Sequence, residues 1–114
     1  MPAASGEGMK DLLAPRTSSL TRYRVPSGGI LTIRVTARSP LDVYMMDSDQ
    51  LSRYEQDGMH GLLPLAASIG HCEHVVSTFQ RPGDSVWLVV ENKSREGSVL
   101  YEYSAEIVGA TIPV

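Results

Sequence analysis

The feature that most constrains the fold is residues 82–108, PGDSVWLVVENKSREGSVLYEYSAEIV. A Pro-Gly pair opens this stretch and marks a turn, because proline sets φ and glycine permits positive φ. Residues 86–90 and 99–107 then carry apolar side chains at every second position, which is the period of a strand with a buried face. The polar residues 92–97 between them predict a hairpin loop. Such a chain must bury alternate side chains of a sheet, which favours an all-β fold.

The same period of two recurs earlier in the chain. Further alternating segments lie at residues 20–25, 31–37, 41–46 and 74–79. Turn residues separate them, notably the Pro-Ser-Gly-Gly cluster at 26–29. About seven to eight strands with closely spaced turns predict an antiparallel, jelly-roll-like β-sandwich.

Residues 47–60 interrupt the alternation. The segment DSDQLSRYEQDG has a candidate N-cap in Ser48 or Asp49 and a glycine stop at Gly58. We expect one short helical turn near residues 49–56. The stretch that follows, to residue 70, reads as either a short strand or a loop.

Size and composition indicate one domain. The chain has 114 residues, 42% of them hydrophobic and 20% charged, with a net charge of −3. We expect a flexible segment at residues 1–17, rich in Gly, Ala, Pro and Ser, and a β-sandwich domain at 18–114. The mild net charge argues against a nucleic-acid or anionic-membrane partner. Basic residues gather in 10–40 and acidic ones after 81, which predicts cross-strand ion pairs.

Compartment and cross-links follow from what the sequence lacks. A single cysteine, Cys72, cannot form a disulfide within the chain. No apolar run approaches the ~18 residues of a membrane-spanning helix. The first residues lack the pattern of a signal peptide, so we expect a cytoplasmic location, with a trimmed export signal as the open alternative.

Three stretches in order carry a resemblance: VPSGGILTIRV, then LDVYMMDSDQLSRYEQDG, then PGDSVWLVVENKS. Together they resemble the small bacterial β-sandwich modules of the pre-peptidase C-terminal type and the related GOLD-type domains. The resemblance covers residues 19–108. It implies an accessory binding or interaction domain rather than a catalytic one.

Two groups of residues could hold a metal. His71, Cys72 and His74 have zinc-ligand chemistry, with His60 upstream, but a strand places only Cys72 and His74 on one face. A cluster at a sheet edge is the alternative. The same Cys72 and His74 are too poorly oriented on a strand to serve as a nucleophile and its base.

A second candidate set consists of Asp47, Asp49 and Asp57, around the predicted helical turn. Calcium needs several converging oxygen ligands, and helix capping explains the same aspartates. Phosphate-binding and nucleophile-elbow motifs are absent from the sequence. We therefore expect neither an enzyme nor a bound cofactor.

The second face of two strands is also apolar, at Tyr44, Met46, Trp87 and Val89. Monomers seldom leave a large apolar patch exposed. The N-terminal segment, the 47–70 excursion, a second copy or a partner could cover these residues, or they could line a ligand groove. The leading hypothesis is a non-enzymatic protein-interaction or assembly module that self-associates through this face or an edge strand. The alternative is an accessory domain that binds a ligand, calcium or zinc.

Overall fold

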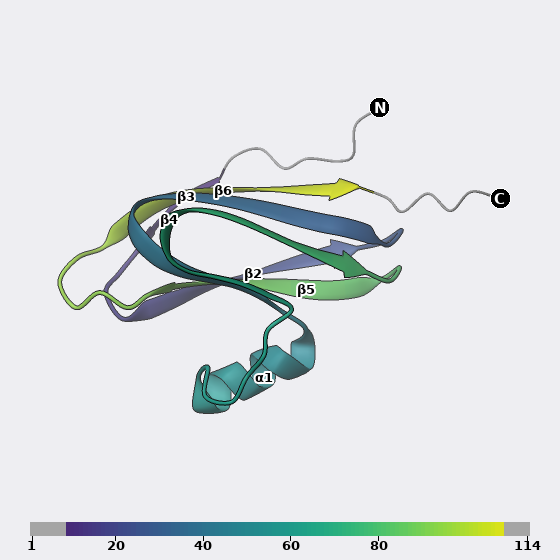
Figure 1. Ribbon diagram of the computed structural model, residues 1–114, viewed down its shortest axis with the longest axis horizontal. Helices are drawn as coiled ribbons and strands as arrows, with labels where there is room; N and C mark the ends of the chain where they lie inside the picture. Colours follow the sequence, from purple (N-terminus) through teal and green to yellow (C-terminus); the bar gives the residue numbers. More distant parts are fainter. Residues whose placement is uncertain (1–8, 109–114) are drawn as a thin grey trace.

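The computed structural model describes residues 9–108, which form six antiparallel strands and one helix (Figure 1). The elements are β1 (Met9–Leu13), β2 (Thr17–Val25), β3 (Gly29–Met46), α1 (Ser48–Asp57), β4 (Ala66–Gln80), β5 (Asp84–Asn92) and β6 (Val99–Val108). The strand order is β1-β6-β3-β5-β2, and β4 pairs with β3 outside this path.

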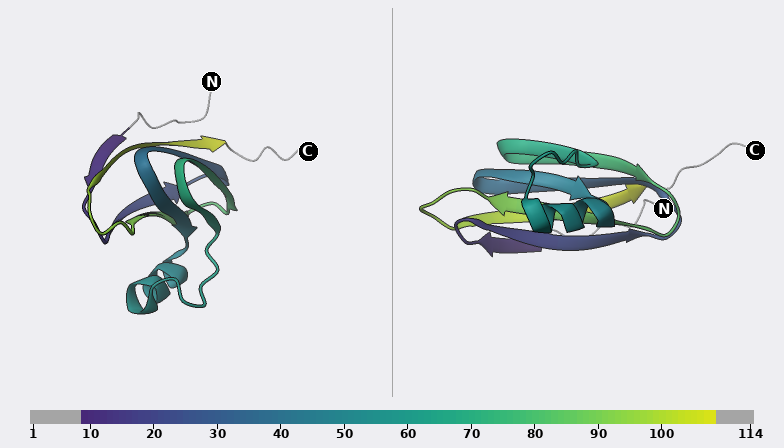
Figure 2. Two further views of the ribbon diagram at one scale, coloured as in Figure 1. Left: turned by 60° about the vertical axis from the view of Figure 1, so that its left-hand side comes forward. Right: turned by 90° about the horizontal axis from the view of Figure 1, so that it is seen from below.

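The long strand β3 organises the sheet. Along one side it pairs with β4 for nearly its whole length. On its other side, residues 30–37 pair with β6, whereas residues 42–46 pair with β5. Because the two halves of β3 have different neighbours, the sheet curls into an open half-barrel (Figure 2).

The antiparallel all-β prediction is confirmed, and the sandwich of about seven to eight strands is corrected to one curled sheet of six strands within residues 9–108. Ser39-Pro40 bends β3 instead of ending it. The pairing of β3 with β4 skips from Thr36 to Leu41, so the proline falls where no ladder partner needs its missing N–H. Of the ambiguous residues 61–70, the last five extend β4 as one strand, whereas 61–65 belong to the loop before it.

The concave side of the curled sheet holds the main core. Strand alternation places Leu31, Ile33 and Val35 inward, each 1% exposed or less. They pack with Leu41, Val43 and Met45 of the same strand and with side chains from each of the other five strands, namely Leu13, Val25, Val76, Val86, Leu88, Val90, Val99 and Tyr101. A single sheet can therefore cover its own apolar face because it curls around it.

Two turns predicted from the sequence meet at one end of this core. The Gly83 N–H donates to the Val25 carbonyl at 2.7 Å. Gly28 has φ +70°, and a Cβ there would lie 2.9 Å from Pro82 Cδ. Both the backbone conformation and the close contact require glycine at position 28.

The N-terminal prediction is corrected in part. Met9–Leu13 forms β1, which pairs with β6, and Thr17 already begins β2. The remainder of the expected flexible segment, residues 1–8, lies outside the described residues. Lys10 Nζ lies 3.2 Å from Glu102 Oε1, an ion pair of the predicted cross-strand kind.

Candidate functional site

The predicted apolar face lies on the convex side of β3 and β5. Tyr44 stands opposite Val89, and Met46 opposite Trp87, so these strands are neighbours as expected. The face is nevertheless covered within the chain by α1 and the loop after it, through Leu51, Tyr54, Met59 and Leu62. Tyr44 is 1% exposed, and Met46 and Val89 are fully buried. The expectation that this face is open for association is therefore corrected, and the 47–70 excursion is the cover.

Local chemistry explains why α1 forms and where it stops. The N-cap is Asp47, one residue before the predicted candidates: its carboxylate accepts the Gln50 N–H at 2.8 Å, and Gln50 Oε1 accepts the Asp47 N–H at 3.1 Å. Gln50 Nε2 also donates to the Leu63 carbonyl at 2.6 Å, which holds the returning loop against the helix. The predicted stop at Gly58 is confirmed as the C-cap.

The three aspartates do not converge. Asp47 caps the helix, Asp49 lies in its first turn, and Asp57 ends it. The ten residues of α1 separate the outer two by roughly 15 Å along the axis. Across residues 9–108, no three His, Cys, Asp or Glu side chains gather where they could hold a metal ion.

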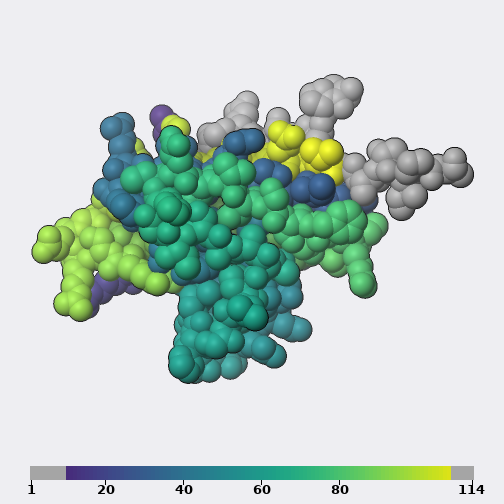
Figure 3. All heavy atoms as spheres, in the orientation of Figure 1, coloured from purple at the N-terminus to yellow at the C-terminus, as the bar shows by residue number. Residues whose placement is uncertain are grey.

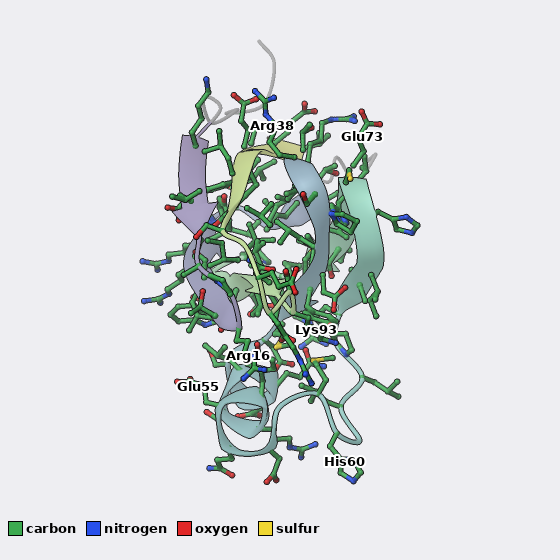
Figure 4. The ribbon with its side chains drawn as sticks, turned by 90° about the vertical axis from the view of Figure 1, so that its left-hand side faces the viewer. Arg16, Arg38, Glu55, His60, Glu73 and Lys93 are labelled. Atoms are coloured by element: carbon green, nitrogen blue, oxygen red, sulfur yellow. The ribbon has the colours of Figure 1, made fainter. Side chains whose placement is uncertain are left out.

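The His71–His74 cluster lies on β4. His71 and Cys72 are exposed, while His74 is only 2% exposed and its Nδ1 lies 2.7 Å from Ser68 Oγ. Burial lowers the pKa of His74. Its Nε2 has no hydrogen-bond partner among the described residues. His60 lies beyond α1, at the opposite end of the molecule from Glu73 (Figure 4), so it does not complete this cluster.

A groove of about 710 Å³ runs beside α1, between the helix and β2 with β5. Arg16, Glu55 and Lys93 lie on this side of the molecule (Figure 4). Its polar groups already pair with one another: Tyr54 Oη donates to Glu91 Oε2 at 2.6 Å, and Lys93 Nζ lies 3.8 Å from Glu91 Oε1. Burial and the bond to Glu91 raise the pKa of Tyr54 to about 12.

The free edge of β4 is a surface that the sequence alone did not single out. Among residues 9–108, this strand of 15 residues pairs only with β3. Its atoms lie open in the space-filling view (Figure 3), and Val75 and Phe79 are 58% and 62% exposed. Phe79 also lies beside Ile30, which lies beside Val108, so an exposed apolar row crosses three strands. The signal in the sequence was a strand with two outward apolar residues and little charge.

The other two edges carry the usual protection against further pairing. β1 has only five residues and bears Lys10 and Asp11. β2 exposes Arg22 and Arg24. By contrast, residues 71–80 of β4 contain no proline or lysine and one carboxylate, Glu73. Because charge, proline and short length are how proteins blunt edges, β4 is the edge best suited to accept another strand.

The helix in the described residues 9–108 is neither long enough nor apolar enough to cross a membrane. No protein-family model and no curated protein matches this chain.

Proposed function

We propose that this protein is a non-enzymatic protein-interaction or assembly module whose contact surface is the free edge of β4. One observation carries the proposal: among residues 9–108, one backbone edge of β4 has no strand partner, and exposed apolar side chains lie beside it. Along such an edge, alternate residues direct N–H and C=O groups outward, where an added strand can pair with them. The motif order that resembles pre-peptidase C-terminal and GOLD-type modules supports an accessory role of this kind.

The chemistry of the cysteine supports a non-enzymatic role. A catalytic thiol needs a base within hydrogen-bond reach. His74 is buried and directs Nδ1 to Ser68, while Cys72 is exposed on the same strand. Val75 and Phe79 are 58% and 62% exposed, and burial of that exposed part against a partner would contribute about 1–2 kcal/mol each.

Light scattering across a concentration series, combined with hydrogen exchange, tests the proposal. We expect a mass above the 12.4 kDa of one chain, and slower amide exchange in β4 as concentration rises. The β2 edge, protected by its arginines, serves as the internal control and should exchange at one rate throughout. Protection that appears on another element while β4 stays unchanged would contradict the proposal, and so would a strict monomer.

Ligand binding is the second candidate, favoured by the groove beside α1, whose volume lies in the range of small-molecule sites. Its metal-binding form, with calcium or zinc, would have to recruit ligands beyond the clusters present in the described part of the chain. Melting scans with each ion discriminate this candidate, because an ion that binds only the folded state raises the melting temperature.

A further inference from the structure

Resting on the proposed function, we infer that the partner of β4 is a second copy of this chain. The two β4 strands pair antiparallel about a twofold axis at Ser77. This geometry continues the curled sheet from one copy into the next. It also assigns a register, because an axis through one residue determines every opposed pair.

The outward side chains of β4 and of the first residue after it are complementary to themselves in this register. Glu73, Val75, Ser77 and Phe79 are exposed on β4, and Arg81 is exposed at the start of the turn that follows. With the axis at Ser77, Glu73 of each copy stands opposite Arg81 of the other, and Val75 opposite Phe79. The stripe thus places opposite charges at both ends and apolar pairs between them.

The charges at the two ends are available for a partner. Within residues 9–108, neither Glu73 nor Arg81 takes part in an ion pair. The side chain of Arg81 is exposed in the turn after β4. A second copy would supply each of these charges with one opposite charge, so that the dimer contains two Glu73–Arg81 pairs by symmetry.

Other registers lose this complementarity. An axis at Glu73 brings two carboxylates together, and like charges directly opposite are destabilising. An axis at Val75 places Glu73 against Ser77, and one at Phe79 leaves Glu73 beyond the paired segment. Sliding one β4 strand by one residue against the other would instead place the exposed apolar side chains of the two copies on opposite faces of the joined sheet.

The neighbouring strands favour the same axis. Thr32 Oγ1 lies 2.8 Å from Ser77 Oγ, so a small, hydrogen-bonded side chain stands where two copies would approach most closely. Val108, Ile30 and Phe79 already form an apolar row across β6, β3 and β4. In the pair, Val75 of the second copy lengthens each of these rows by one residue.

Charge reversal with mixing tests the register. We expect Glu73→Arg alone and Arg81→Glu alone to weaken dimerisation about tenfold, because each places two like-charge pairs at the interface. An equimolar mixture of the two variants restores opposite charges at both positions and should recover the wild-type mass. The loop variants Glu96→Arg and Arg95→Glu are matched controls, with exposed charges away from β4.

Cross-linking provides an independent readout. In a Cys72→Ser background, Ser77→Cys should oxidise to a covalent dimer, because position 77 faces itself across the axis. Ser94→Cys in the exposed β5–β6 loop should not. A wild-type chain that stays monomeric, or a mixture that fails to recover mass, overturns the inference. If β4 amides are still protected on concentration when the mixture fails, the proposed function stands and only the register is wrong.

Discussion

At the scale of single residues, Asn92 shows how one buried amide holds separate segments together. Its Nδ2 donates to the Leu13 carbonyl at 3.0 Å and the Gly97 carbonyl at 2.9 Å, and its Oδ1 accepts the Ser94 N–H at 3.0 Å. Asn92 is fully buried, so these bonds are shielded from water. The side chain therefore joins the end of β1 to the loop between β5 and β6.

We predict that Asn92→Leu lowers the free energy of unfolding by about 1–3 kcal/mol, because it leaves two carbonyls without their donor. Urea denaturation of both proteins measures this difference. Ser94→Ala is the control, since Ser94 is exposed and its hydroxyl accepts only the Glu96 N–H at 3.2 Å. Equal stability of Asn92→Leu and the wild type would show that water replaces these bonds.

His74 gives the fold a dependence on pH. Burial lowers the pKa of His74 below its ordinary value of 6.5, although a backbone hydrogen bond at His71 and the charge of Asp42 act in the opposite direction. The folded state therefore holds the neutral ring, and the unfolded chain takes up the proton first as pH falls. The contribution of neutral His74 to folding stability is therefore complete above pH 6.5 and is lost progressively below it.

We predict that the melting temperature falls between about pH 7 and about pH 5.5, and that His74→Gln removes most of this dependence. Thermal melts in a pH series measure it. His71→Gln is the control: His71 is exposed on the same strand, so that variant should keep the wild-type slope. A slope that survives in His74→Gln would assign the dependence to other groups.

At the scale of elements, α1 decides what the convex face of β3 and β5 does. Leu51 and Tyr54 pack on Tyr44 and Val89. The apolar side chains that would suit an interface are therefore part of a buried core. Packing on this face also stabilises the helix, because an isolated helix of ten residues is only marginally stable in water.

We predict that Tyr44→Ala destabilises the fold by about 3–5 kcal/mol, in the range of large-to-small core substitutions. Denaturant unfolding measures the loss, and Leu63→Ala, at a side chain that is 86% exposed, should change little. Should Tyr44→Ala keep its stability but lose solution mass, the face beneath α1 would be an interface after all.

At the scale of the whole molecule, the open sheet leaves β4 with one paired side among the described residues. A closed barrel would have no such edge. The curl that lets a single sheet enclose its core thus also leaves an unpaired strand, and association is one way to satisfy it.

We predict that Phe79→Lys yields a monomer at concentrations where the wild type associates, because a lysine on an edge strand opposes pairing. Light scattering and thermal melting together measure this. Phe79 is 62% exposed, so the monomer should stay folded, with a melting temperature lowered only by the lost association. Leu63→Lys makes the same kind of change on an exposed loop residue and should leave association intact.

The sequence by itself determined the antiparallel class, the inward rows and the existence of a helix near residues 49–56. Alternation at Leu31, Ile33 and Val35 predicted their burial, because side-chain direction in a strand is a local property with a period of two. Only the tertiary structure decided that β3 continues through Ser39-Pro40, that α1 covers Tyr44, and that β4 is an open edge. These depend on which strands lie side by side, and pairing between residues distant in the sequence leaves no local pattern to read.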